Sequence, residues 1–493
     1  MASDWSLPVQ AGEGKRSVIG ASNGYEIRAH HQTDSCSFLV VELSQSESEL
    51  YPFMSGGNSG LHYGYDRTQP IVCPRTATSR RAVSVLNQMG ARYLHLLCSW
   101  IAGASRVAPR NWRLGFGMIV RCFVLVFLTA WIGIPAACGQ GTSGVRMNEI
   151  QVIGTHNSYH AGFAPSEERL WGRLAPDSLP SLDYRHAPLD QQLDAGVRQI
   201  ELDVFADAKG GLFADPAGPR LVAQSGLSAD PPFDPQGVLR RPGFKVMHVQ
   251  DIDYRSTCQP FVACLELVRS WSHAHPGHVP LFILVETKSG KLKQVSFRSV
   301  EPEPFTPSVF DALDAEIRSI FPSDELITPD LVRGDFATLN QAIRKQGWPR
   351  LDSVRGKVVF LMDQRPARAA YLRGHASLRG RVLFTNSEPG RADAAFIERN
   401  EGSAAEINLL IREGYLVRTR TDSGTEEARS GDIRRRDEKL GSGAQLLSTD
   451  YPASEPSRWT GYSVALPGAV PARCNPVLRP TGCVDSALEV PAR

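Results

Sequence analysis

The sequence predicts an α/β protein of the (β/α)₈ TIM-barrel class, and two observations favour this class. From Val145 onward, short apolar or β-branched runs alternate with longer stretches that have the composition of helices, as in repeated βα units. Eight of the short runs are candidate strands, which is the number that such a barrel contains. Reacting groups lie at the carboxyl ends of the strands in this fold, so ionisable residues at those ends are the first functional candidates.

The predicted strands are, in chain order, EIQVIGTH ending at His156, VRQIELDV ending near Asp203, FKVMHV at His248, LFILVET at Glu286, KVVFLMD at Asp363, RVLFTN at Asn386, YLVRTR at Arg420 and LLSTD at Asp450. Predicted helices between them include PLDQQLDAG, CLELVRSWSHAHP, FDALDAEIRSIF and AEINLLIREG. The last helix has a predicted stop, because Gly414 stands where a glycine takes up the left-handed conformation. The Gly/Pro-rich stretch between Asp203 and His248 is predicted to be a loop over the barrel mouth.

Composition excludes several classes of protein. Hydrophobic residues make up 42% and charged residues 22% of the 493 residues, which is typical of globular proteins and unlike collagen-like, wholly disordered or polytopic membrane chains. The formal net charge is only +2, so charge gives no global attraction to nucleic acid. The partner must therefore be inferred from local chemistry.

The segment 118–139 is the clearest targeting signal. Arg121 supplies positive charge, residues 122–134 supply an apolar core of signal-peptide length, and small residues follow. The run is shorter than the roughly 20 apolar residues of a membrane-spanning helix. We therefore expect a secreted, periplasmic or extracellular protein; a membrane anchor through 118–138 and lipidation at Cys138 are the alternatives.

Residues 1–117 precede this signal and show no sustained helical or strand period. They are rich in Ser, Gly and Arg, which does not indicate a packed domain. We expect either a disordered extension or a start assigned too far upstream, with Met118 as the initiator.

Four of the nine cysteines lie beyond the targeting segment, and they form two locally spaced pairs, Cys258 with Cys264 and Cys474 with Cys483. Such pairs suit disulfides in an oxidising compartment, with free thiols as the alternative.

Polar residues end the first four predicted strands. The first ends in His156 and Asn157, the second carries Glu201 and Asp203, the third ends at His248, and the fourth ends in Glu286, Thr287 and Lys288. Glu201 and Asp203 are two apart on a strand, so their carboxylates point the same way. Each of these residues alone is weak evidence for a site, but the set at successive strand ends is specific.

The oxygen donors in this set are Asn157, Glu201, Asp203 and Glu286, which favour a hard cation, and Ca²⁺ tolerates such an irregular mixture better than Mg²⁺ does. The two histidines remain free to move protons near neutral pH. A cation beside two histidines is what cleavage of a phosphodiester needs. The cation lowers the pKa of the attacking hydroxyl and offsets charge on the phosphoryl oxygens, while one group takes the hydroxyl proton and another gives a proton to the leaving alcohol.

These motifs resemble a known family. GTHNSYH at 154–160, IELDV at 200–204, the strand-end His248 and ILVETK at 283–288 are similar to the catalytic X-region of phosphoinositide-specific phospholipase C, most closely its calcium-dependent secreted bacterial and fungal branch. The resemblance covers roughly residues 147–490. It implies a single catalytic domain over 145–493 with the PLC-like phosphodiesterase type of TIM barrel.

The resemblance also implies roles for the residues. Asn157, Glu201, Asp203 and Glu286 would carry calcium, His156 would stabilise the pentavalent transition state, and His248 would protonate the diacylglycerol oxygen. Glu201 is the first candidate for the base that deprotonates the inositol 2-hydroxyl, and His156 is the second. The products would be diacylglycerol and a cyclic or linear inositol phosphate.

The implied partner is phosphatidylinositol or a related phospholipid at a membrane surface, with no nucleic acid and no protein partner. Lys288, Arg418 and Arg420 lie near strand ends and are candidates to contact the substrate phosphate; a structural or solvated cation is the alternative for each, and Asp450 is equally ambiguous.

Two other functions compete with this one. A glycerophosphodiester phosphodiesterase has the same fold and chemistry, but that family typically shows His-Arg-Gly at the first strand and His-Asp at the third, where this chain has His156-Asn157-Ser158 and His248-Val249. A catalytically silent phospholipid-binding barrel is the second alternative. The presence of both histidines and all four oxygen donors counts against it, because a binding protein needs no general acid.

Overall fold

The computed structural model describes residues 17–22, 25–31, 39–45, 144–293, 295 and 297–489. The chain divides into two compact units, Met1–Leu125 and Val126–Arg493, which are described separately. The predicted targeting segment 118–139 lies outside the described residues. Among the residues that are described, no helix has the length and apolar character needed to cross a membrane.

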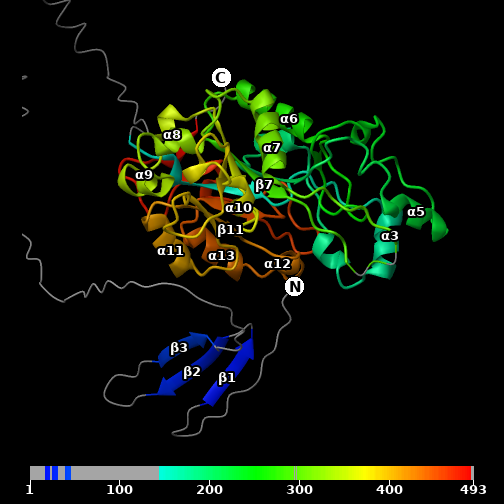
Figure 1. Cartoon of the computed structure of the whole chain (residues 1–493), viewed down its shortest axis with the longest axis horizontal. Coiled ribbons are helices and arrows are strands. Elements are labelled where there is room, and N and C mark those ends of the chain that lie inside the picture. The colour runs from blue at the N-terminus through cyan, green and yellow to red at the C-terminus, as the bar shows by residue number, and fades with distance from the viewer. Residues whose placement is uncertain are drawn as a thin grey trace, which may run out of the picture. The chain divides into compact units, whose positions relative to one another are not determined.

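The first unit contains a three-stranded antiparallel sheet in the order β1-β2-β3 (Figure 1). Its strands are β1 (Ser17–Ser22), β2 (Tyr25–His31) and β3 (Leu39–Gln45). All three strands lie within residues 1–117, for which the sequence predicts a disordered or misassigned extension, and the β1–β2 register shifts between Val18 and Ala21.

The second unit is a barrel of eight parallel strands. The strand order is β10-β11-β12-β4-β5-β7-β8-β9, and a parallel bridge between Asn386 and Phe396 joins β9 to β10 and brings the two ends of the sheet together. The barrel strands are β4 (Ile150–Thr155), β5 (Gln199–Phe205), β7 (Leu281–Thr287), β8 (Val358–Met362), β9 (Leu383–Thr385), β10 (Phe396–Glu398), β11 (Leu416–Arg420) and β12 (Leu446–Thr449). The predicted (β/α)₈ class is confirmed.

One predicted strand is wrong and one is missing from the prediction. FKVMHV contributes only β6 (Lys245–Val246), which pairs antiparallel with the end of β5 outside the barrel, so His248 lies in a loop. β5 pairs directly with β7 over residues 199–204, which leaves no place for a strand between them. The eighth barrel strand is β10, a strand of three residues that was not among the predicted ones.

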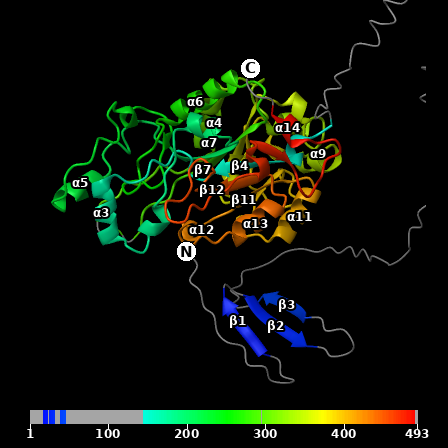
Figure 2. The same cartoon turned by 180° about the vertical axis from the view of Figure 1, so that it is seen from behind.

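The helices of this unit lie around the barrel or in the excursions beside it (Figures 1 and 2). They are α3 (Pro165–Leu174), α4 (Leu189–Asp194), α5 (Ala217–Gln224), α6 (Phe261–Ala274), α7 (Pro307–Ile320), α8 (Pro329–Arg333), α9 (Leu339–Lys345), α10 (Arg368–Tyr371), α11 (Ala404–Arg412), α12 (Glu426–Ser430), α13 (Arg434–Gly441) and α14 (Asp485–Leu488). α11 shows how the sequence sets such bounds: Ser403 and Glu406 form a reciprocal capping box at its start, and Gly414 follows its end at φ +95° as predicted.

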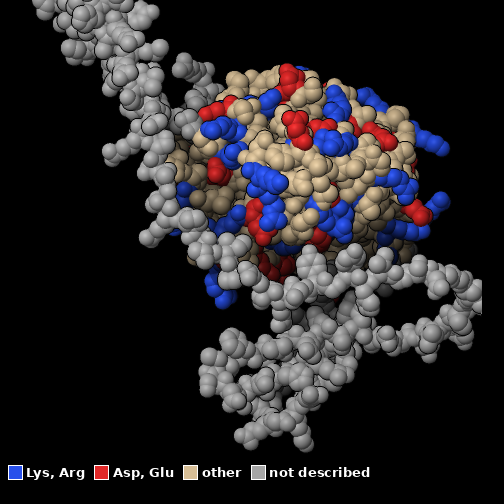
Figure 3. Space-filling model, turned by 60° about the vertical axis from the view of Figure 1, so that its left-hand side comes forward, with Lys and Arg blue, Asp and Glu red and all other residues tan. Residues whose placement is uncertain are grey.

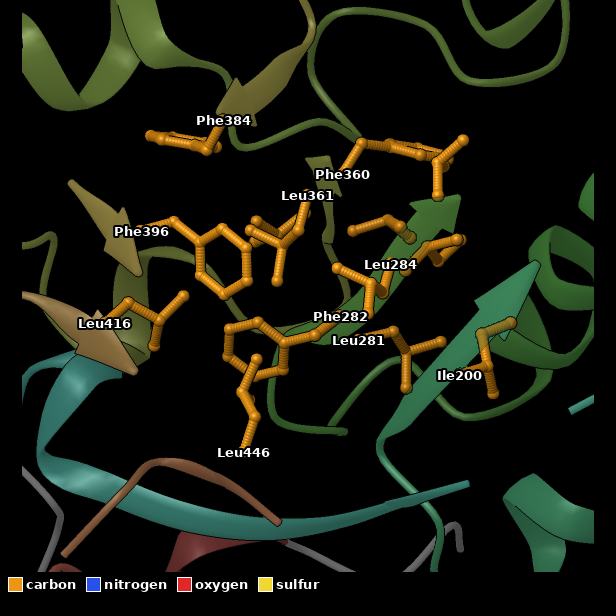
Figure 4. Close-up of a cluster of buried hydrophobic side chains, with 14 of the residues drawn as sticks. Ile200, Leu281, Phe282, Leu284, Phe360, Leu361, Phe384, Phe396, Leu416 and Leu446 are labelled. Carbon is orange, nitrogen blue, oxygen red and sulfur yellow. The ribbon is translucent and has the colours of Figure 1, made fainter. Parts of the chain in front are cut away.

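The hydrophobic core is formed by side chains of the barrel strands and of the helices that pack against them. Figure 4 shows large apolar side chains from successive barrel strands meeting in one cluster, including Ile200, Phe282, Phe360, Phe384 and Phe396, each at most 1% exposed. Burying one such side chain stabilises the fold by about 1.5–3 kcal/mol. The rigid cluster fixes the strands whose carboxyl ends carry the polar residues.

The long excursions after β4, β5 and β7 form a lobe beside the barrel, with α3 and α5 at its edge in both views (Figures 1 and 2). Leu170, Trp171 and Val222 form its small apolar core. The stretch predicted as a loop therefore contains a helix, α5, because Val222 and its neighbours have apolar partners on α3.

Both predicted cysteine pairs form disulfides, Cys258–Cys264 and Cys474–Cys483. The first ties the chain after His248 to the start of α6, and the second closes a loop near the C-terminus.

Candidate active site

The turn after β4 positions His156 and Asn157. Asn157 has φ +47°, a left-handed conformation that asparagine tolerates better than most residues. Ser158 holds the turn against β5, because its backbone N–H donates to the Glu201 carbonyl and its hydroxyl accepts from the Glu201 N–H at 2.8 Å. The sequence motif thus fixes a histidine and an amide directly beside the next strand.

Three carboxylates converge at the ends of β5 and β7. Glu201, Asp203 and Glu286 each offer an oxygen within 4.8 Å of the others, and Asp203 and Glu286 are paired in register. Lys288 Nζ lies 2.9 Å from Asp203 Oδ2 and 2.9 Å from Glu286 Oε1. The Lys288 ammonium group therefore bridges two of the three carboxylates.

Burial of these carboxylates changes their acidity. Loss of solvation raises the pKa of Glu201 to about 7, against the opposing effect of the neighbouring Arg418 charge. Loss of solvation and the Glu286 charge raise the pKa of Asp203 well above its usual value, and Lys288 opposes this. Converging carboxylates with raised pKa values favour binding of a proton or a cation.

The donors present fit a hard cation such as Ca²⁺. Asn157 Nδ2 donates to the Tyr184 hydroxyl at 2.8 Å, while Asn157 Oδ1 is buried and accepts no hydrogen bond within the described part of the chain. A buried, unpartnered amide oxygen and three carboxylates are the oxygen ligands that Ca²⁺ takes in proteins. These four donors are the predicted set.

His156 is oriented by a residue from the last barrel strand. Its Nδ1 lies 2.8 Å from Asp450 Oδ1, and because a carboxylate only accepts, Nδ1 carries a proton. The other ring nitrogen, Nε2, lies 3.8 Å from Glu201 Oε1. Burial lowers the pKa of His156 well below its usual value, and the charges of Arg420 and Arg418 add to this effect.

His248, in the loop beyond β6, is also held by a carboxylate at Nδ1. Its Nδ1 donates to Asp253 Oδ2 at 2.8 Å, and the same carboxylate accepts from buried His160 Nε2 at 2.8 Å. Burial lowers the pKa of His248, and its bond to Asp253 opposes the change. The His248 ring is therefore fixed through Nδ1, and its Nε2 remains available for a substrate.

The three residues predicted to contact the substrate phosphate, Lys288, Arg418 and Arg420, differ in their ion-pair partners and in their exposure. Arg418 is 2% exposed and forms ion pairs with Glu201 at 2.6 Å and with Glu398. Arg420 pairs with Asp450 at 2.8 Å, and Lys288 pairs with two carboxylates as described above. All three lie among the site carboxylates, with Arg418 the most enclosed.

Sequence reasoning missed several residues of this network, namely Asp253, Tyr184 and Glu398. Asp253 lies five residues after His248, which is a weak signal, and Tyr184 lies in an irregular segment with no periodic pattern. Asp450 was ambiguous from sequence, and the structure places it against His156.

Residues 145–476 match the family described as phosphoinositide phospholipase C, Ca²⁺-dependent. The chain belongs to this family. It is accordingly a phosphodiesterase of the phospholipase C type. No curated protein matches the chain.

Several solved structures are similar to this phospholipase C family member at low sequence identity. A calcium-dependent phosphoinositol-specific phospholipase C from Pseudomonas sp. is 16% identical, with a TM-score of 0.41, over 67% of this chain and 95% of its own. A Ca²⁺-dependent phosphatidylinositol-specific phospholipase C from Streptomyces antibioticus is 18% identical, with a TM-score of 0.40, over 62% of this chain and 95% of its own. The phosphatidylinositol-specific phospholipase C from Listeria monocytogenes is 13% identical, with a TM-score of 0.33, over 64% of this chain and 93% of its own.

Proposed function

We propose that this protein is a secreted enzyme that cleaves phosphatidylinositol to diacylglycerol and an inositol phosphate, with calcium and two histidines. The observation that carries the proposal is the cluster of three carboxylates, Glu201, Asp203 and Glu286, beside the turn that carries His156 and Asn157, with His156 Nε2 3.8 Å from the Glu201 carboxylate. Family membership supports the reaction class.

Asn157, Glu201, Asp203 and Glu286 would hold the calcium ion. When bound, the ion supplies positive charge that lowers the pKa of the attacking inositol 2-hydroxyl and offsets charge on the phosphoryl oxygens. Glu201 would accept the proton of that hydroxyl, because a carboxylate with a pKa near neutrality both takes and gives up a proton readily. His156 remains the second candidate for this base.

In its doubly protonated form, His156 would stabilise the negatively charged, pentavalent phosphorus transition state by donating from Nε2 to a phosphoryl oxygen, while Nδ1 donates to Asp450. In its doubly protonated form, with Nδ1 donating to Asp253, His248 would transfer the Nε2 proton to the departing diacylglycerol oxygen. Lys288 and Arg420 would contact the phosphoryl oxygens, and Arg418 would hold Glu201 in position from its buried place between two carboxylates.

The remaining proposals concern processing. We take 145–493 as the catalytic domain and 118–139 as the signal peptide, and the two disulfides support export to an oxidising compartment. N-terminal sequencing of the protein recovered from culture medium is expected to give a start near residue 139, whereas a start near Met1 would contradict the assignment.

A substrate panel tests the function. The full chain is incubated with calcium and phosphatidylinositol vesicles, glycerophosphoinositol or glycerophosphocholine, and phosphorus NMR follows each phosphate. We expect the intact lipid to be cleaved with a cyclic inositol phosphate as the first product. Cleavage of only the deacylated diesters would instead indicate a glycerophosphodiester phosphodiesterase, and vesicle binding without turnover would indicate a silent binding barrel.

A further inference from the structure

A hollow lies in the lobe beside the barrel. It has a volume of about 700 Å³ and is formed between α5 and the chain that follows β7. Its walls include the apolar residues Leu212, Leu292 and Phe297. None of these residues belongs to the catalytic set, and Phe297 is anchored against Trp171 of α3 with ring centroids 6.2 Å apart. We call this feature the α5 hollow.

Unpaired positive charge faces the α5 hollow from two sides. Arg220 on α5 and Arg298 after β7 line it, both are exposed, and neither makes an ion pair or a side-chain hydrogen bond with the described residues. The buried acid of the hollow, Asp251, is already satisfied, because its two oxygens accept from the backbone N–H groups of Ala217 and Val300. Among the described residues that line the hollow, Arg220 and Arg298 are therefore the cations that remain free to bind an anionic group.

The acidic side chains at the rim do not cancel this charge. Asp215 pairs with Arg240 at 3.2 Å, and Glu301 pairs with Lys291 at 3.1 Å. The sequence from Lys288 to Val300 contains no acidic residue. On the face of the barrel unit seen in Figure 3, by contrast, acidic and basic side chains are interspersed.

The α5 hollow is joined to the catalytic loop by direct contacts. Gln250 Nε2 donates to the Gly290 carbonyl at 2.7 Å, and Asp251 accepts from Val300 N–H at 2.7 Å. Both residues lie between His248 and its partner Asp253. The hollow and the proposed general acid thus share one loop at the carboxyl end of the strands.

We propose that the α5 hollow docks the enzyme on a bilayer by binding the headgroup of an anionic phospholipid other than the substrate. Arg220 and Arg298 bind the lipid phosphate, and Leu212, Leu292 and Phe297 contact the upper acyl region. This combination of guanidinium groups and apolar side chains matches the charge and polarity of an anionic membrane surface. The inference rests on the proposed function, since a lipid substrate brings the enzyme to such a surface.

Vesicle binding tests the docking site separately from catalysis. The full chain is sedimented with phosphatidylcholine vesicles that contain either no phosphatidylglycerol or about 30% of it, which gives an anionic surface. Chelator is present and the vesicles hold no phosphatidylinositol, so that neither calcium nor an inositol headgroup contributes to binding. Arg220→Glu/Arg298→Glu is expected to weaken binding to the anionic vesicles at least about tenfold, because each of the two basic residues contributes roughly a factor of five in affinity at such a surface. Arg220→Lys/Arg298→Lys is expected to retain most of the binding.

A matched control reverses two exposed cations elsewhere. Lys345 and Arg373 lie in the connections that lead into β8 and β9, and Lys345→Glu/Arg373→Glu is expected to bind anionic vesicles like the wild type. Wild-type binding by the Arg220/Arg298 reversal, or equal loss in the control, would overturn the proposal.

Catalysis on a monomeric substrate completes the test. The substrate is dihexanoyl phosphatidylinositol below its critical micelle concentration. Its turnover by the Arg220→Glu/Arg298→Glu variant is expected to stay within about twofold of the wild-type value, because both arginines are exposed and lie outside the catalytic set. A parallel loss of this turnover would overturn the docking role. Absence of turnover in the wild type would refute the proposed function, while the vesicle measurement would still decide the docking site.

Discussion

His156 and Asp450 are joined by a 2.8 Å hydrogen bond between Nδ1 and Oδ1, although 294 residues separate them in sequence. The barrel brings them together, because β12 pairs directly with β4 and Thr449 lies opposite Thr155. Asp450 also pairs with Arg420, so its orientation is fixed from a third strand. The histidine tautomer is therefore set by the closure of the barrel.

Replacing Asp450 by asparagine tests this relationship. The amide of Asp450→Asn donates as well as accepts, so the proton of His156 is no longer confined to Nδ1. We expect kcat/KM to fall on the order of 10²–10⁴, with a changed pH profile and little change in Tm. The exposed Asp335→Asn serves as the control. An unchanged pH profile would show that Asp450 does not orient His156.

The assignment of His248 as general acid predicts a loss of activity without a loss of fold. His248→Ala is expected to lower kcat on the order of 10²–10⁴ on phosphatidylinositol. A substrate with a more acidic leaving alcohol is expected to recover much of the rate, since it needs less protonation. The matched control is His273→Ala, because His273 is exposed on α6. Equal losses on both substrates would remove His248 from leaving-group protonation.

Calcium affinity is expected to depend on pH. Burial raises the pKa values of Glu201 and Asp203, so protons occupy the ligand oxygens as the pH falls and must leave when calcium binds. With the Glu201 pKa at about 7, the calcium dissociation constant is expected to increase about tenfold or more from pH 8 to pH 6. Calorimetry in buffers of different ionisation enthalpy measures the released protons, and a dissociation constant independent of pH would contradict this account.

Removing a ligand carboxylate tests the metal assignment. Asp203→Asn is expected to weaken calcium binding by at least about tenfold, because one of three negative charges is lost. The exposed Asp177→Asn is the control and is expected to bind calcium normally. An unchanged calcium titration of Asp203→Asn would place the cation elsewhere.

Lys288 is expected to oppose calcium and to stabilise the calcium-free protein. Its ammonium group lies between Asp203 and Glu286, so Lys288→Met leaves these carboxylates facing each other. We expect a loss of about 2–4 kcal/mol in the free energy of unfolding in chelator, tighter calcium binding, and recovery of Tm with calcium. Lys209→Met changes an exposed lysine and is the control. Weaker calcium binding in Lys288→Met would contradict the competition.

The sequence predicted much of the fold and the donors of the site, for physical reasons. Seven barrel strands lie within the predicted apolar or β-branched runs, and Glu201 and Asp203 share a face because side chains alternate along a strand. β10 was missed although β9, which was predicted, is equally short, and β6 was wrongly placed in the barrel because an apolar run does not specify its pairing partner. Asp253 and Tyr184 lie in irregular segments, where only the folded chain shows what they contact.

The central claim is that calcium held at the ends of β4, β5 and β7 is required for cleavage of phosphatidylinositol. The most direct measurement is diacylglycerol release from phosphatidylinositol vesicles by the full chain in chelator, then after addition of calcium or of magnesium. The account predicts no release in chelator, recovery with calcium, and little recovery with magnesium. Equal release in chelator and in calcium would contradict it.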